Sequence, residues 1–375
     1  MEKKIRAVGT ALLVLIWLAL TGFAWFGQRT EVSEAERRPL ASAPTLSVEA
    51  INEGDFMEDF EDFTLDQFPL RDSFRQIKSL FHFYGLQQLD NNDIYIKDGY
   101  AAKQLYPLNE DSVNYAVKRF NDIYTQFLEG KAANCYVTVV PDKGYYLSEK
   151  AGQLTADYEK LFSLVEGGMP WATYIDLTAT LEASDYYRTD THWKQENLIP
   201  VAQKLTQAMG VTPPAADAFT PKPVDYPFYG VYYGQAAVPQ KPDQLQIMES
   251  DILKDCKVYT YDDNLKKTQI PMYDLSKLTS GDPYNIYLSG ARVGLVQIEN
   301  PNATTDRDLI VFRDSFGSSI GPLLAQGYKT VTLIDIREIP SPNLKVLAMY
   351  LKLDFSGDVL MLYSTTVLNA GNELK

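Results

Sequence analysis

The first feature of the hydropathy pattern is an uncharged apolar segment near the N-terminus. Residues 7–26 carry no charge and consist mostly of aliphatic and aromatic residues. At about 1.5 Å per residue, a helix of this length spans roughly 30 Å, the thickness of a bilayer core. Lys3, Lys4 and Arg6 precede it and predict an inward N-terminus, with the rest of the chain outside the cytoplasm. A cleaved signal peptide is the alternative, but no small-x-small site follows the long apolar run, so an uncleaved anchor is favoured.

Beyond this segment the pattern indicates a polar linker and then a globular part. We assign residues 1–27 to the transmembrane anchor, 28–50 to the linker and 51–375 to one α/β domain. Residues 213–301 differ from the rest of that domain because they are rich in Pro, Tyr and short alternating runs. This stretch is predicted to be an insertion of β and loop character.

In the rest of the globular part, segments with helical periodicity alternate with short apolar runs typical of buried strands. Helices are expected at residues 111–128, 158–165, 193–209, 318–326 and 343–351. Strands are expected at residues 135–140, 171–177, 309–312, 330–336 and 359–363. Pro200 must kink the third helix or mark its start. The alternation predicts a mostly parallel sheet with helices on both faces.

Composition narrows the classes of function. The 375 residues carry a formal charge of −14, which disfavours nucleic acid as a partner because its phosphates are also negative. With only two histidines, a multi-histidine metal centre is excluded, and no other cofactor is required. Cys135 and Cys256 could form a disulfide outside the cytoplasm, but Cys135 lies in a buried apolar run, where free cysteine is common.

One candidate for chemistry surrounds His192, in the segment Thr189-Asp190-Thr191-His192-Trp193. Asp190, two residues earlier, can reach imidazole Nδ1 and leave Nε2 free as a base. The alternative is that Asp190 or Thr191 caps a helix and His192 lies on the surface. His82 is a poorer base, because Leu80-Phe81-His82-Phe83-Tyr84 is typical of a packing segment.

A second candidate is Ser315, in a segment where a buried strand continues into Asp314-Ser315-Phe316-Gly317 and a helix. A serine at the carboxyl end of a parallel strand faces the crevice in which open α/β sheets bind ligands. Backbone amides near Ser315 and Phe316 can then stabilise an oxyanion. Ordinary helix capping by Asp314 or Ser315 is the alternative. The two candidates support each other, because a serine nucleophile needs an oriented base.

The Asp-x-His-Trp and downstream Asp-Ser-Phe-Gly segments together resemble the DHHW proteins, which are related to the SGNH-hydrolase-like domains of bacterial alginate and exopolysaccharide O-acetylation proteins. The resemblance covers about residues 30–365 and rests on the order of its motifs. Further matching pieces are Glu36–Ala41, Asp66–Asp72, Ile94–Tyr100, Val140–Lys143, Phe228–Gly230 and Leu333–Arg337.

The resemblance implies an SGNH-like three-layer α/β sandwich in which Ser315 is the nucleophile, His192 the base and Asp190 its orienter. The order Asp, His, Ser is permuted relative to ordinary SGNH esterases. The family name implies Asp-His-His-Trp, but Thr191 stands in place of the first histidine. This chain therefore has no residue for a role specific to that histidine. Gly230 is a further oxyanion candidate, and Trp193 a candidate for substrate contact.

Two more residues are weaker candidates for substrate binding. Lys143 follows a buried strand and could face the same crevice, or lie solvated in a loop. Arg337 could bind an acidic sugar, or form a structural salt bridge to a carboxylate such as Asp335.

The resulting hypothesis is an extracytoplasmic polysaccharide O-acetyltransferase or acetylesterase that works through an acetyl-serine. The resemblance implies a multipass membrane acyltransferase as acetyl donor and a glycan as partner. A non-catalytic polysaccharide-binding or assembly protein of an exopolysaccharide O-acetylation or export system is the alternative from another class.

Overall fold

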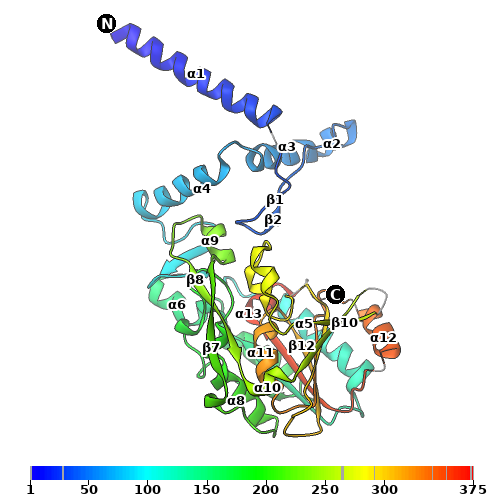
Figure 1. The fold of residues 1–375 in the computed structure, drawn as a ribbon. Coiled ribbons are helices and arrows are strands. Elements are labelled where there is room, and N and C mark those ends of the chain that lie inside the picture. The colour runs from blue at the N-terminus through cyan, green and yellow to red at the C-terminus, as the bar shows by residue number, and fades with distance from the viewer. Residues whose placement is uncertain are drawn as a thin grey trace. The chain divides into compact units, whose positions relative to one another are not determined.

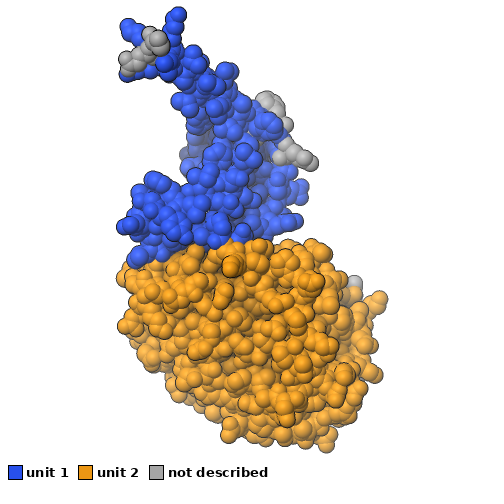
Figure 2. Space-filling model, turned by 60° about the vertical axis from the view of Figure 1, so that its left-hand side comes forward, with its two compact units in different colours: residues 1–92, 233–239 blue, residues 93–232, 240–375 orange. Residues whose placement is uncertain are grey.

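The computed structural model describes residues 2–27, 29–262, 266–290, 292–339, 341–351, 353–371 and 374. They form two compact units, which Figure 2 colours separately. Unit 1 comprises residues 1–92 and 233–239, and unit 2 comprises residues 93–232 and 240–375. The compact units therefore divide after Asn92, whereas the division into anchor, linker and domain stays a prediction.

Unit 1 begins with the long helix α1 (Glu2–Phe26; Figure 1). From Lys3 to Phe23 it is long and apolar enough to cross a membrane, by length and composition. The following elements are β1 (Val32–Ser33), β2 (Arg38–Pro39), α2 (Val48–Glu53), α3 (Asp55–Asp66), α4 (Arg71–Leu80) and the π-helical turn η1 (Phe81–Gly85). Helix α9 (Val231–Ala236) leads from unit 2 into the returning segment of unit 1.

Ionic contacts hold the β1–β2 hairpin against α3 and α4. The carboxylate of Asp66 accepts hydrogen bonds from the Arg38 guanidinium at 2.8 and 2.6 Å and from the Ala41 amide at 2.9 Å. Arg71 pairs with Glu36 at 2.5 Å and with Asp66 at 3.1 Å. These residues come from two of the short motifs seen in the sequence, so the motifs build one network.

Unit 2 is organised around a sheet that has eight strands among the described residues. Their order is β10 (Lys267–Ile270), β9 (Lys257–Tyr261), β11 (Leu295–Glu299), β13 (Thr330–Ile334), β12 (Asp308–Arg313), β14 (Asp358–Ser364), β5 (Asn134–Val140) and β6 (Thr173–Tyr174). The five strands from β13 to β6 pair in parallel, and β11, β9 and β10 extend the sheet with antiparallel pairs. The stretch 213–301 thus supplies three strands of the main sheet.

Two antiparallel pairs lie outside the main sheet: β3 (Ile94–Lys97) with β4 (Tyr100–Lys103), and β7 (Thr220–Phe228) with β8 (Asp243–Glu249). The α-helices of unit 2 are α5 (Glu110–Ile123), α6 (Lys143–Ala151), α7 (Tyr158–Gly168), α8 (Ile199–Ala208), α10 (Asp251–Lys254), α11 (Gly317–Leu324), α12 (Ser341–Tyr350) and α13 (Thr365–Asn369). Shorter turns are η2 (Tyr124–Leu128), η3 (Ala183–Asp185), η4 (Gln195–Asn197), η5 (Ala216–Ala218), η6 (Leu275–Thr279) and η7 (Pro283–Ile286). Pro200 lies in the first turn of α8, so it marks the start of that helix.

Strand β12 shows that the sheet is covered on both faces. Leu309 and Val311 belong to one buried core, with residues of α8 and α11, whereas Ile310 and Phe312 belong to another, with residues of α5 and α7. Successive side chains of a strand point to opposite faces, so two helical layers enclose the sheet. The predicted three-layer α/β fold with a mostly parallel sheet is confirmed.

Both cysteines are free thiols. Burial raises the pKa of Cys135 and of Cys256 to about 11, so both stay protonated and unreactive at neutral pH. The disulfide left open by the sequence is absent from this structure.

Substituting Asp66 by Asn tests the network of unit 1. The hydrogen bonds from Arg38 hold the pKa of Asp66 below its usual range. The ionised carboxylate therefore stabilises the fold above the pKa of an unfolded Asp, about 4. That contribution disappears as the pH falls through the folded pKa.

We expect Asp66→Asn to lower the free energy of unfolding at neutral pH, and the deficit to shrink in acid. Denaturant titration of the full chain in detergent at several pH values measures it. Asp59 is exposed on the same helix, so Asp59→Asn should leave the free energy of unfolding unchanged both at neutral pH and in acid. A deficit that is equal in acid and at neutral pH contradicts the ionic role.

Candidate active site

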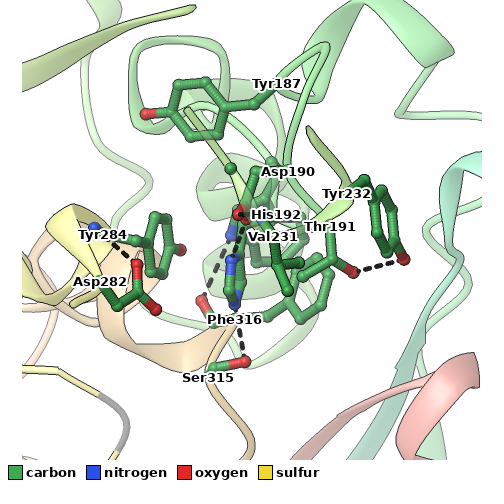
Figure 3. A network of polar contacts seen from close by, with 12 residues as sticks. Tyr187, Asp190, Thr191, His192, Val231, Tyr232, Asp282, Tyr284, Ser315 and Phe316 are labelled. Carbon is green, nitrogen blue, oxygen red and sulfur yellow. Dashed lines mark hydrogen bonds and ion pairs between the residues drawn. The ribbon is translucent and has the colours of Figure 1, made fainter. Parts of the chain in front are cut away.

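Ser315 and His192 meet at the carboxyl end of the parallel sheet. Ser315 follows β12 in the turn that leads into α11, and His192 lies in the irregular segment before η4. The distance from Ser315 Oγ to His192 Nε2 is 2.7 Å, and from His192 Nδ1 to Asp190 Oδ1 it is 2.5 Å (Figure 3). Residues 123 positions apart in the sequence thus form one hydrogen-bonded chain of the kind that activates a serine.

The carboxylate of Asp190 is fully buried and holds the histidine loop in place. Its Oδ1 accepts hydrogen bonds from the His192 amide at 3.0 Å and from His192 Nδ1, and its Oδ2 accepts one from the Val231 amide at 2.9 Å. Because an ionised carboxylate only accepts, Nδ1 carries the proton and Nε2 presents its lone pair to Ser315.

Gly230 contributes to this site by its small size, not as an oxyanion donor. Its amide already donates to Thr189 Oγ1 at 3.0 Å. A Cβ at this position would lie 2.3 Å from the Cβ of Asp190, far inside van der Waals contact. The prediction that Gly230 helps to bind an oxyanion is therefore wrong, and the close approach allows the next amide, of Val231, to reach Asp190.

Asp243, at the start of β8, is a second anchor of the histidine loop that the sequence did not reveal. Its carboxylate accepts hydrogen bonds from the amides of Arg188 and Thr189 at 2.9 and 2.8 Å, and from Thr189 Oγ1 at 2.6 Å. No local pattern marks Asp243, because its partners are more than 50 residues away in the chain.

Lys143, the first residue of α6, is buried behind the same loop. Its ammonium donates to the carbonyls of Tyr187 at 2.8 Å and Arg188 at 3.4 Å and lies 5.1 Å from the Tyr232 ring centroid. Burial lowers the pKa of Lys143 to about 7, although the nearby carboxylate of Asp190 opposes the shift. Lys143 is therefore neither solvated nor open to substrate, and it supports the backbone that precedes Asp190.

Asp314 shapes the turn that carries the serine. Its buried carboxylate accepts from the Phe316 amide at 3.0 Å and from the Ser364 amide at 2.7 Å, which joins the turn to the end of β14. The Phe316 amide is thus occupied, which corrects its assignment as an oxyanion donor. Within the described residues, the Ser315 amide has no acceptor, so it is the donor that remains for an oxyanion.

Tyr284, in η7, covers one face of the His192 ring. The two rings stack with centroids 3.8 Å apart and planes inclined by 7°. The Tyr284 hydroxyl donates to Ser319 Oγ at 2.8 Å, and Trp193 Nε1 donates to the same oxygen at 2.8 Å. Trp193 is fully buried, so its predicted contact with substrate is wrong. It ties the histidine loop to α11.

Arg337 is committed to a structural ion pair. Its guanidinium donates to both carboxylate oxygens of Asp335, at 3.0 and 2.7 Å, and Arg313 approaches the same carboxylate at 3.4 Å. Of the two interpretations left open by the sequence, the structure shows the salt bridge. Among the described residues, no three His, Cys, Asp or Glu side chains are grouped so that they could hold a metal ion.

A known protein family matches the part of the chain that contains this site. Residues 173–334 match the DHHW protein family. The matched DHHW segment contains Asp190, His192 and Ser315, so the resemblance inferred from the motifs is confirmed. No curated protein matches the sequence significantly.

Solved structures with TM-scores near 0.6 show the same fold. A DHHW family protein from Eubacterium siraeum has a TM-score of 0.61 and 21% identity, over 76% of this chain and 94% of that one. Bacillus cereus PatB1 has a TM-score of 0.61 and 19% identity, over 75% and 98%. The O-acetyltransferase domain of Pseudomonas putida AlgJ is more distant, with a TM-score of 0.42 and 15% identity over 74% and 92%.

Replacing Lys143 by Met tests how the loop is supported. The pKa of about 7 lies below the 10.5 of a free lysine, so between these values the unfolded chain binds a proton that the folded chain lacks. Stability of the wild type should then rise with pH, by up to about 1.4 kcal/mol per pH unit.

We expect Lys143→Met to lack this rise, in denaturant titrations between pH 7 and 9. Lys150→Met, exposed at the end of the same helix, is the matched control and should keep the wild-type slope. Parallel slopes for the wild type and Lys143→Met would show that Lys143 is not a buried, titrating group.

Proposed function

We propose that this protein transfers acetyl groups to or from hydroxyl groups of a cell-surface or secreted polysaccharide. The observation that carries the proposal is the hydrogen-bonded chain from Asp190 through His192 to Ser315. Such a chain serves acyl transfer, because it supplies a nucleophile, a base and an orienting carboxylate. The acetyl group and the glycan come from the resemblance to O-acetylation proteins, and AlgJ is named as an O-acetyltransferase domain.

In the proposed mechanism, Ser315 Oγ attacks the acetyl carbonyl carbon while His192 Nε2 takes the hydroxyl proton. The Ser315 amide is placed to donate to the oxyanion that forms. Collapse breaks the bond to the donor oxygen, which leaves with the proton from His192. The acceptor hydroxyl then loses its proton to His192 and attacks the acetyl-serine. The bond between Ser315 Oγ and the acetyl carbon breaks, and Oγ takes the proton back from His192. Asp190 stays ionised throughout and stabilises the imidazolium.

Membrane anchoring is part of the proposal. The basic residues at the start of α1 favour an extracytoplasmic position for unit 2, where a secreted glycan is accessible. Since acetyl donors are made in the cytoplasm, a multipass membrane acyltransferase would hand the group across the bilayer. Whether a sugar hydroxyl or water accepts the acetyl group separates transferase from esterase, and water exclusion from the site decides it.

Hydrolysis of p-nitrophenyl acetate, followed by acetyl transfer to oligosaccharides, tests the proposal directly. We expect Ser315→Ala in the full chain to lower kcat by about a thousandfold or more, because the nucleophile is lost. Ser356→Ala, in an exposed turn before β14, should be unaffected. Activity that survives in Ser315→Ala rejects Ser315 as the nucleophile. If the wild type binds glycan without turnover, a binding or assembly protein is favoured.

Substitutions of Tyr284 test whether its ring positions the base. Tyr284→Phe keeps the stack on His192 and loses only the bond to Ser319, so its kcat should stay within a few-fold of the wild type. Tyr284→Leu loses the aromatic contact, worth about 0.5–1.5 kcal/mol, and should lower kcat about tenfold. KM should not change in either variant. A loss that is equal in both variants assigns the effect to the hydroxyl group.

A further inference from the structure

A row of apolar side chains on unit 1 is largely exposed, although the Phe74 ring meets Phe68 edge to face with centroids 5.4 Å apart. Phe74, Ile77 and Phe81 are spaced by three and four residues, so they fall on one side of α4. Leu70 lies just before this helix and Tyr84 lies in η1 just after it. Their exposed fractions are 71, 45, 61, 59 and 75%. We call these five residues the apolar stripe. Large exposed apolar surfaces of this kind mark interaction sites.

Arg75 and Ser79 make polar contacts from the opposite side of α4, which fixes the direction of the stripe. Arg75 donates to the Gly234 carbonyl at 2.8 Å and pairs with Glu36 at 3.1 Å. The Ser79 hydroxyl, fully buried, donates to the Ala236 carbonyl at 2.5 Å. The helix therefore cannot rotate to bury the stripe within unit 1 without breaking these contacts.

Short covalent and polar links keep the start of the stripe close to the end of α1. Thr30 comes four positions after Phe26, so the two residues are at most about 14 Å apart. Thr30 then exchanges two hydrogen bonds with Gln67, at 3.1 and 2.9 Å, just before α4. If α1 crosses the membrane, Leu70 is held near the bilayer surface.

The charges around the stripe fit a lipid surface. Arg71 and Arg75 are paired with Glu36, so the basic charge of α4 that lies beside the stripe is that of Lys78. Lys78 lies beside the stripe and is exposed, with no ion pair in the part of the chain that the structure describes. Basic residues beside an apolar face of Leu and aromatic residues are typical of helices that lie in the membrane interface. Helix α3, by contrast, is strongly acidic and would be repelled by anionic lipids.

Three of the five stripe residues are aromatic; Tyr favours the lipid headgroup region, and Phe is common on the apolar face of interfacial helices. The spacing also suits a second helix, but the π-helical turn at η1 breaks the regular repeat that a long helix pair needs. We propose that α4 and η1 lie on the bilayer with the apolar stripe inserted among the lipids. This inference rests on the membrane anchoring in the proposed function.

Fluorescent labels at single cysteines test the docking in the full chain. Cys135→Ala and Cys256→Ala provide the background, and Ile77→Cys, Asp72→Cys and Leu15→Cys each carry an environment-sensitive nitrobenzoxadiazole label. The protein is reconstituted into vesicles of phosphatidylcholine and phosphatidylglycerol. Lipids with a nitroxide on the acyl chain quench labels in the bilayer, and added dithionite bleaches labels in water.

We expect the label at position 77 to be quenched by the nitroxide lipid and bleached several-fold more slowly than the label at position 72. Equal bleaching at the two positions overturns the docking. Protection at position 77 without lipid quenching also overturns it, because a protein surface then covers the stripe. The label at position 15 tests the membrane anchor separately. If the nitroxide lipid quenches the label at position 15 but not the label at position 77, the anchor stands and the docking of the stripe is rejected.

Discussion

The buried carboxylate of Asp190 is the interaction on which the rest of the site depends. A charge in a dry interior is stable only when hydrogen bonds replace its water, and Asp190 obtains these from His192 and from the Val231 amide. Val231 reaches it only because Gly230 has no side chain. The carboxylate thus joins the histidine loop to the segment after β7, and the same bond that stabilises this junction sets the tautomer of the base.

A second buried carboxylate, that of Asp314, holds the serine turn by hydrogen bonds to backbone amides in the same way. Asp314 is also buried, and it binds one amide of the serine turn and one amide at the end of the neighbouring strand β14. The position of Ser315 therefore follows from the register of the parallel sheet. The histidine loop and the helix after the serine turn are also connected directly. The ring of Tyr284 stacks on His192, and Tyr284 and Trp193 both donate hydrogen bonds to Ser319. A 2.7 Å contact between loops distant in sequence needs this degree of support.

Predictions from local pattern succeeded where the residues of one segment are enough to determine its secondary structure. Buried strands such as β12 are short runs of apolar residues, and Pro200 can occupy only a first helical turn without breaking the helix. Predictions failed where a side chain meets a partner that pattern does not reveal. Trp193 was a candidate for substrate contact, but it is fully buried and donates to Ser319 of α11. Lys143 suggested a solvated or substrate-facing lysine, but two carbonyls of the histidine loop hold it.

The sequence by itself predicted the candidate pair His192 and Ser315 and the chemistry that such a pair could perform. Only two histidines are present, one carries an aspartate two residues earlier, and one serine follows a buried strand at the start of a helix. Tertiary structure alone decided which amide is open to an oxyanion, that Gly230 is a packing residue, and that Asp243, Lys143 and Tyr284 support the base. The physical reason is that periodicity and motif spacing report contacts within a few residues. Hydrogen bonding and burial of these groups join segments tens to hundreds of residues apart.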